Sequence, residues 1–233
     1  MDRVTRKALK TDRFAVEVTH SVEYVTEHRR QALLYGGAAL VLLLLAGGGY
    51  FWVQKRRSSA HEALYKALET AHAAVTEEES FGRLTFRTEK EKNDKALKDF
   101  QDVLQRFPKT SEARIARYYV GLVHNETGNV AEAQKQLEQA IRDGHDDVLA
   151  LARLSLADLY LEQGKDEEAR KLYQFLIENP TATVSEGRAQ LAMARFLRPR
   201  KPEEARKLLL ELMKRPGPVA GAAGTMIREL GQQ

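Results

Sequence analysis

Cysteine is absent from the 233-residue sequence, and its absence excludes several kinds of site. Without thiols the chain has no disulfide, no cysteine nucleophile, no cysteine-type zinc site and no cysteine for lipid attachment. Both a reducing cytoplasm and the cell envelope accommodate such a chain, so the compartment stays open.

A strong excess of one charge is also lacking. The chain has 37 Lys and Arg against 33 Asp and Glu, a formal net charge of +4. Nucleic-acid-binding domains are usually more basic, and no basic block accompanies a motif that reads bases. We therefore expect no nucleic-acid partner.

Patterns of catalysis and metal binding are missing as well. The six histidines form no HExxH and no pair four residues apart, and neither a P-loop nor GxSxG occurs. His124 falls at a packing position that Tyr160 and Phe196 occupy elsewhere in the repeats described below, which favours a core role. We predict no catalytic residue, no metal and no cofactor, and hence a protein that is not an enzyme.

One long apolar run is present, from residue 32 to residue 53. Its 22 residues carry no charge, and as a helix they would extend roughly 33 Å, enough to cross a bilayer. A core helix of a soluble protein would show a polar stripe. A signal peptide would have a shorter apolar stretch and a small-x-small cleavage site. The run predicts a permanent transmembrane helix.

Charged and aromatic residues mark the ends of this anchor: Arg29, Arg30, Trp52, Lys55, Arg56 and Arg57. Basic residues are nearly equal in number on the two sides, so the positive-inside rule does not orient the span. Apolar residues recur at helical spacing within residues 11–31. The N-terminal tail, residues 1–31, therefore has an amphipathic helix that lies either in solvent or on the membrane surface.

The rest of the chain repeats itself. Ala96, Ala133, Ala169 and Ala205 are spaced 36 or 37 residues apart, and a large side chain follows each of them four positions later. A second register runs through the helix that precedes each of the last three alanines. Gly128 and Gly164 end such helices, as left-handed cap glycines do. Helix pairs at a fixed period of this length are typical of a solenoid and not of an ordinary bundle.

The small-residue slots, the A-x3-F pattern and the terminal proline resemble tetratricopeptide repeats over residues 93–218. The resemblance implies an α-α superhelix, and with the apolar run it predicts an all-α fold in which a transmembrane helix precedes this superhelix. The residues expected to pack the repeats are Ala96, Phe100, Gly121, Ala133, Leu137, Ala157, Tyr160, Ala169, Tyr173, Phe196, Ala205 and Leu209.

Two segments flank the repeats. Residues 54–92 form a linker with an amphipathic helix over 59–75, which is either the first solenoid helix or a cap on the first unit. Residues 219–233 form a C-terminal cap with a short helix. We expect no strands, and a loop over 77–93 that packs Phe81, Leu84 and Phe86 on the solenoid.

The layout resembles the family of the ancillary SecYEG translocon subunit. The segments YVTEHRRQAL, SEARIARYYVGLVHNETGN and ARLSLADLYLEQGKDEEARKLYQFLIENPTA carry this likeness. It implies a single-pass protein of the bacterial inner membrane with its repeats in the periplasm. Its partners would be client polypeptides and the SecYEG translocon.

The second face of each unit's first helix is the predicted peptide groove. The groove is mostly apolar, and its residues recur 36 apart except Leu151, which lies beside them. Ala194 shares their register, and the groove residues are Tyr118, Leu122, Asn125, Leu151, Leu154, Asp158, Leu161, Gln190 and Leu197. Either this groove is open to an apolar ligand, or the solenoid's curvature or the C-terminal helix buries it.

The predicted anchor and groove are compatible with two functions. The first is an envelope chaperone or translocon-associated adaptor that binds client polypeptides. The second is a structural scaffold that organises a membrane complex, such as division or secretion machinery, without chaperone activity.

Overall fold

The computed structural model describes residues 29–76, 82, 84–142 and 147–230. Helices make up most of this part of the chain, which confirms the predicted all-α class. The amphipathic helix expected before residue 29 lies outside the described residues, and so does Phe81.

Helix α2, Arg29–Ala71, contains the apolar run. The chain divides into two compact units, residues 1–56 and 57–233, and the apolar run belongs to the first. In that unit the described apolar side chains are exposed, and the most apolar window has a mean hydropathy of 1.8 with nothing buried inside the structure. By length and composition, α2 can cross a membrane, as predicted.

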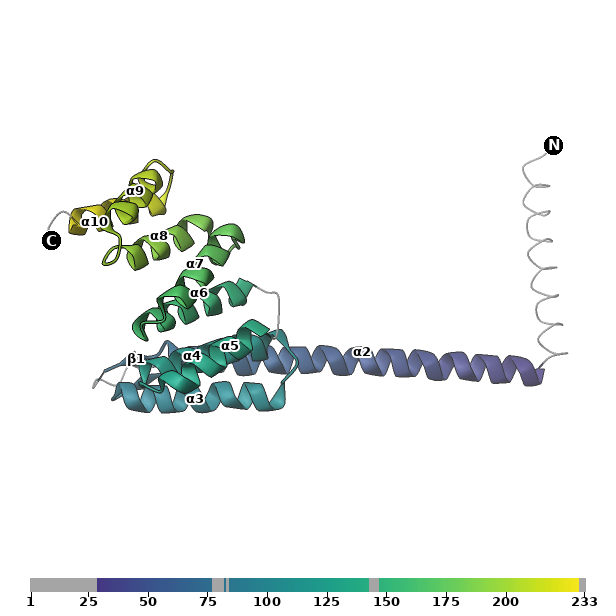
Figure 1. The fold of residues 1–233 in the computed structure, drawn as a ribbon. Helices are drawn as coiled ribbons and strands as arrows, with labels where there is room; N and C mark the ends of the chain where they lie inside the picture. The colour runs from purple at the N-terminus through teal and green to yellow at the C-terminus, as the bar shows by residue number, and fades with distance from the viewer. Residues whose placement is uncertain (1–28, 77–81, 83, 143–146, 231–233) are drawn as a thin grey trace, which may run out of the picture. The chain divides into compact units, whose positions relative to one another are not determined.

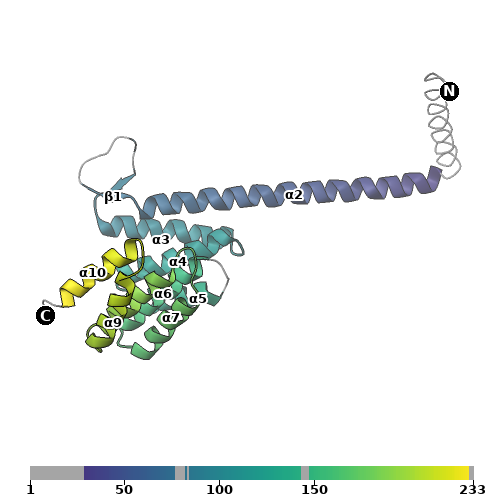
Figure 2. The same cartoon turned by 90° about the horizontal axis from the view of Figure 1, so that it is seen from above.

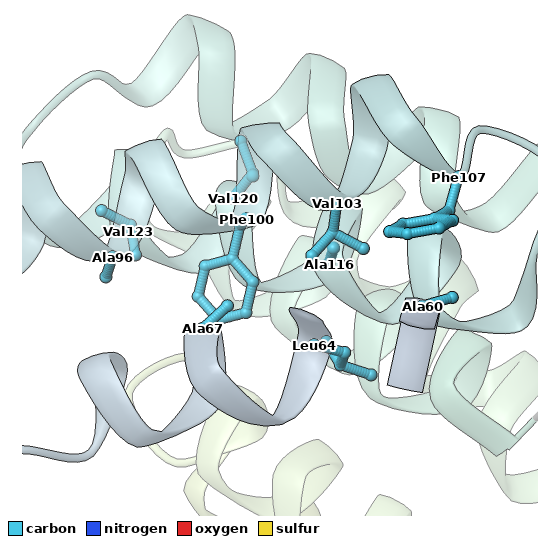
Figure 3. Packing of buried hydrophobic residues seen from close by; sticks show 10 residues of the cluster. All are labelled: Ala60, Leu64, Ala67, Ala96, Phe100, Val103, Phe107, Ala116, Val120 and Val123. Carbon is cyan, nitrogen blue, oxygen red and sulfur yellow. The ribbon is translucent and has the colours of Figure 1, made fainter. Parts of the chain in front are cut away.

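The last turns of α2 have a different character because they belong to the repeat domain. Ala60, Leu64 and Ala67 are at most 5% exposed and lie in one buried cluster with residues of α3, Glu89–Arg106, and α4, Ser111–Glu126 (Figure 3). Spacings of three and four residues place these small side chains on one face of the helix. The first solenoid helix is thus the end of α2.

A two-stranded sheet corrects the expectation that this segment has no strands. Strand β1, Ala74–Val75, pairs in parallel with β2, Thr85–Phe86. Strands of two residues are too short to give an alternating pattern, which explains the omission. Leu84 is 43% exposed and so does not pack on the solenoid as expected, whereas Phe86 is half-buried.

Helix α3 begins earlier than the sequence reading placed it, inside the predicted loop. Thr88 is its N-cap, and the Thr88 hydroxyl accepts a hydrogen bond from the backbone N–H of Glu91 at 3.1 Å. Such a cap satisfies an N–H that has no partner within the helix. A threonine followed three residues later by glutamate is the sequence signal for this start.

The remaining helices stack as successive neighbours. Each packs on the next in chain order (Figure 1), and the view from above shows the pairs overlapping along the stack (Figure 2). Beyond α4 they are α5, Val130–Arg142; α6, Asp147–Glu162; α7, Asp166–Glu178; α8, Glu186–Leu197; α9, Pro202–Met213; and α10, Pro218–Leu230.

Glycines in the left-handed conformation end α4 and α6. Gly128 has φ of 77° and Gly164 has φ of 72°, a region that side chains with a Cβ rarely adopt. Past these glycines, the N–H of Asn129 and the N–H of Lys165 donate back to the helices that have just ended, each at 2.8 Å. Glycine therefore allows the chain to turn within a few residues into the next helix.

The core follows the period seen in the sequence. Ala96, Ala133, Ala169 and Ala205 are each 0% exposed. A Cβ added to Gly121 would lie 2.9 Å from the Leu137 side chain. The absence of a Cβ at Gly121 therefore lets α4 and α5 approach each other closely. Among the residues expected to pack the repeats, Tyr160 alone is only half-buried.

Candidate interaction surface

Helices α4, α6 and α8 carry the predicted groove residues at equivalent positions. We call this set the first-helix face, and every member is half-buried: Tyr118, Leu122, Asn125, Leu151, Leu154, Asp158, Leu161, Gln190 and Leu197. Spacings of three, four and seven residues put the members within each helix on one side. The face is therefore partly accessible along the three helices.

Some apolar members of the face help to join neighbouring units. Tyr118 packs against a buried cluster that contains Leu137 and Leu156. Leu154 packs against two clusters, one around Met193 and one around Leu176. These side chains hold the solenoid together as well as lining its surface.

Helix α10 covers one end of the register. Ala194 is 0% exposed and lies in a cluster with Leu209, Leu212 and Ala223 of the last two helices. Leu122, in α4, belongs to none of the buried clusters found among the described residues. The C-terminal helix thus helps to bury the predicted groove only at its α8 end.

A buried phenol holds the one carboxylate of the face. The Tyr173 hydroxyl, from α7, donates to Asp158 Oδ1 at 2.6 Å, and Tyr173 is only 1% exposed. Burial, and then this hydrogen bond, raise the pKa of Tyr173 far above its usual range. The phenol remains a proton donor to Asp158 at any physiological pH.

The side-chain nitrogen of Gln190 has its partner within the domain. Its side-chain amide donates to Glu186 Oε1 at 2.9 Å, and Arg215 donates to the same oxygen at 2.8 Å. The hydrogen bond from Arg215 lowers the pKa of Glu186. This network ties α8 to the turn between α9 and α10.

Two further ion pairs engage the arginines at the end of α8. Arg200 donates two hydrogen bonds of 2.6 Å to Asp166, and Arg198 lies 2.9 Å from Glu229. The bidentate pair lowers the pKa of Asp166. Both arginines are therefore neutralised by carboxylates of neighbouring helices.

A cavity lies at the turn between α3 and α4, and it was not predicted from the sequence. Its volume is about 310 Å³, and Arg117 on its wall donates to Gln136 at 3.2 Å. The lining is mostly polar: Pro108, Lys109, Thr110, Ala113, Arg114 and Arg117. These residues follow the turn and not the repeat register, so the periodic pattern gave no sign of them.

The predicted ends of the anchor lie in α2. The Arg56 guanidinium carbon is 5.2 Å from the centre of the Trp52 ring, a cation–π distance, and Arg30, Lys55 and Arg57 are exposed. Arg29 is the first residue of the helix. Aromatic and basic side chains are typical of the membrane–water interface.

Within the described ranges, no group of three or more His, Asp or Glu side chains could hold a metal ion. What the geometry offers instead is an extended surface of half-buried side chains on stacked helix pairs. Such a surface is typical of α-helical solenoids, a class of proteins that use it to bind other proteins.

The chain belongs to the tetratricopeptide repeat-like domain family, whose model matches residues 28–196. The match takes in the apolar run and ends in α8, so α9 and α10 lie beyond it. This family is generally a non-enzymatic interaction fold. No curated protein matches the chain.

Proposed function

We propose that the protein is a membrane-anchored interaction module that binds apolar segments of client polypeptides through the first-helix face. The observation that carries the proposal is the repeat of half-buried apolar residues on α4 and α6, outside the part of the register that α10 covers. An apolar face of this kind favours ligands with apolar side chains and little sequence selectivity.

A role as envelope chaperone or translocon-associated adaptor fits this surface. The exposed apolar run of α2 supports a single-pass anchor, which would keep the repeats close to polypeptides that emerge from a membrane channel. The resemblance to the ancillary SecYEG subunit family supports the periplasmic side of the inner membrane for residues 58–233.

Protease accessibility tests the orientation. Protease added to spheroplasts should digest the repeat domain, while a tag at the N-terminus survives. A repeat domain that is digested only after the membrane is opened would contradict the periplasmic orientation.

A substitution at Leu122 tests the client site. Leu122→Asp places a charge on the face without opening a buried cluster, so we expect client binding to fall with little change in thermal unfolding. Leu210→Asp is the matched control, because Leu210 is 47% exposed on α9. Leu154→Asp should also reduce binding but would unfold the domain in part, because Leu154 packs against two clusters.

An aggregation assay separates the chaperone from the scaffold. The full-length protein in detergent should suppress aggregation of an unfolded, reduced model client, and Leu122→Asp should lose this activity. If the protein and the variant are equally inactive while both still pull down the same membrane complex, the scaffold function is correct.

A further inference from the structure

Asp158 is the single carboxylate in an otherwise apolar and amide-bearing face. The equivalent positions one unit before and one unit after it, 36 residues away, are Leu122 and Ala194. Along its own helix, Leu154 and Leu161 lie on the same side as Asp158. A charged group at the centre of an apolar strip is costly unless something pairs with it.

The carboxylate is held in place by a group that cannot neutralise it. Tyr173 reaches Asp158 from the buried side and donates its proton to Oδ1 at 2.6 Å. In the described part of the chain, Oδ2 accepts no hydrogen bond. An ionised carboxylate can accept several, so Asp158 has capacity for another donor.

Two of the cations near this part of the solenoid are paired with other carboxylates. Arg200 pairs with Asp166 and Arg198 pairs with Glu229. Arg195, on α8, acts on Tyr173 through its charge, but no ion pair joins it to Asp158. Asp158 thus has no cationic partner among the described residues.

Two further carboxylates occupy related positions of the repeat register. Glu162 lies four residues on, one turn along α6, and Glu126 lies at the equivalent position of α4, 36 residues earlier. Both are exposed, and none of the ion pairs between described residues includes them. Asp158, Glu162 and Glu126 thus form no ion pair within the described residues, and charge complementarity favours a cation on the partner.

We infer that the first-helix face binds an apolar polypeptide segment that carries a lysine or arginine, whose cationic group pairs with Asp158. This inference rests on the proposed function and adds a selectivity rule to it. Apolar side chains of the segment contact Leu122 and Leu154, while Asp158 fixes the position of the cation. Segments with an acidic residue at that point are repelled.

Three labelled peptides test the rule with the full-length protein in nanodiscs of zwitterionic lipid. The peptides consist of alanine, leucine and glutamine and differ at one central position, which is lysine, norleucine or glutamate. Fluorescence anisotropy should show the lysine peptide binding roughly three- to tenfold more tightly than the norleucine peptide, the range of a partly exposed charged hydrogen bond. The glutamate peptide should bind most weakly.

Asp158→Asn should remove the preference for lysine and leave the affinity for the norleucine peptide unchanged. Tyr173→Phe should reduce the preference in part, because it frees the carboxylate to turn. Asp102→Asn, on an exposed position of α3, is the matched control and should bind as the wild type does.

The outcomes distinguish the selectivity rule from the proposed function. Equal affinity for the lysine and norleucine peptides, or a lysine preference that survives in Asp158→Asn, would overturn the role of Asp158 and leave apolar binding intact. Absence of binding to all three peptides would overturn both.

Discussion

Helix α2 contains two kinds of apolar surface, and their difference explains much of the molecule. In the apolar run Leu44 is 67% exposed, whereas near the end of the helix Leu64 is 5% exposed. The second leucine has found its partners in α3 and α4, within the chain. The first has none among the described residues, and it belongs to a run long and apolar enough to cross a bilayer.

The comparison shows that the identity of a residue does not decide its burial. Both segments are helical and rich in alanine and leucine. Polar residues at every turn leave only one stripe of the later segment to be buried, whereas the apolar run has no polar side at all. Four experiments test this distinction and the packing of the repeat domain.

The largest effect is expected from charges in the apolar run. Replacing Leu43 and Leu44 with arginine should release the protein from membranes, because arginine at the centre of a span costs about 2.5–3.5 kcal/mol per residue. Alkaline extraction of membranes measures this directly. Arg substitution of Leu210, which is exposed on α9, is the control and should leave the protein in the membrane fraction.

The same substitution, leucine to alanine, compares how the apolar run and the end of α2 contribute to the stability of the repeat domain. Leu64→Ala should destabilise the repeat domain by about 2–5 kcal/mol, because it leaves a cavity in a buried cluster. Leu44→Ala should leave the free energy of unfolding of this domain unchanged. Urea unfolding followed by circular dichroism in detergent measures both. Equal effects of the two changes would contradict the assignment of Leu64 to the core.

A smaller effect is expected from overpacking one junction between helices. Ala169 is 0% exposed, so Ala169→Phe should cost on the order of 1–3 kcal/mol. Hydrogen exchange should increase first in α6, α7 and their neighbours, because repeats contact mainly the next repeat. Arg170→Phe, on the exposed neighbouring position, is the control. An unchanged melting temperature for Ala169→Phe would show that the register is wrong.

The smallest effect concerns the exposed pair of Arg200 and Asp166. The pKa of Asp166 lies below its ordinary value of 3.8 in the folded protein, mainly because Arg200 donates hydrogen bonds to it. The pair therefore adds stability at neutral pH, and this contribution is lost as the pH falls through the folded pKa. The wild type should melt slightly above Arg200→Gln at pH 7, and the difference should shrink in acid and in high salt. A difference that persists in acid would assign the effect to the contact of Arg200 with the Phe196 ring.

The sequence predicted those parts of the fold that depend on periodicity. The alanines at the close approaches of helices, the glycines that end α4 and α6, and the apolar run are visible because a regular spacing or a long uniform composition marks them. The two-residue strands and the start of α3 have no such spacing. The capping signal at Thr88 and Glu91 was present, but it lies in the segment that breaks the repeat pattern and was therefore predicted to be a loop.

The candidate surface was less predictable than the fold. Spacing placed its residues on equivalent helix faces, but it could not show that Leu154 also packs in the core or that α10 covers Ala194. The bond between Tyr173 and Asp158 joins two helices across a turn, and neither residue alone indicates it. Contacts of this kind depend on the angle at which helices cross, which the repeat period does not specify.

The interior of the repeat domain is divided among successive clusters and has no single centre. Each cluster joins a helix pair to the one before or after it, from the end of α2 to α10. A helix pair added to or removed from such an array alters two boundaries and leaves the other interiors as they were. Such an array can therefore gain or lose whole helix pairs in evolution, while the chemistry of each remaining pair is inherited intact.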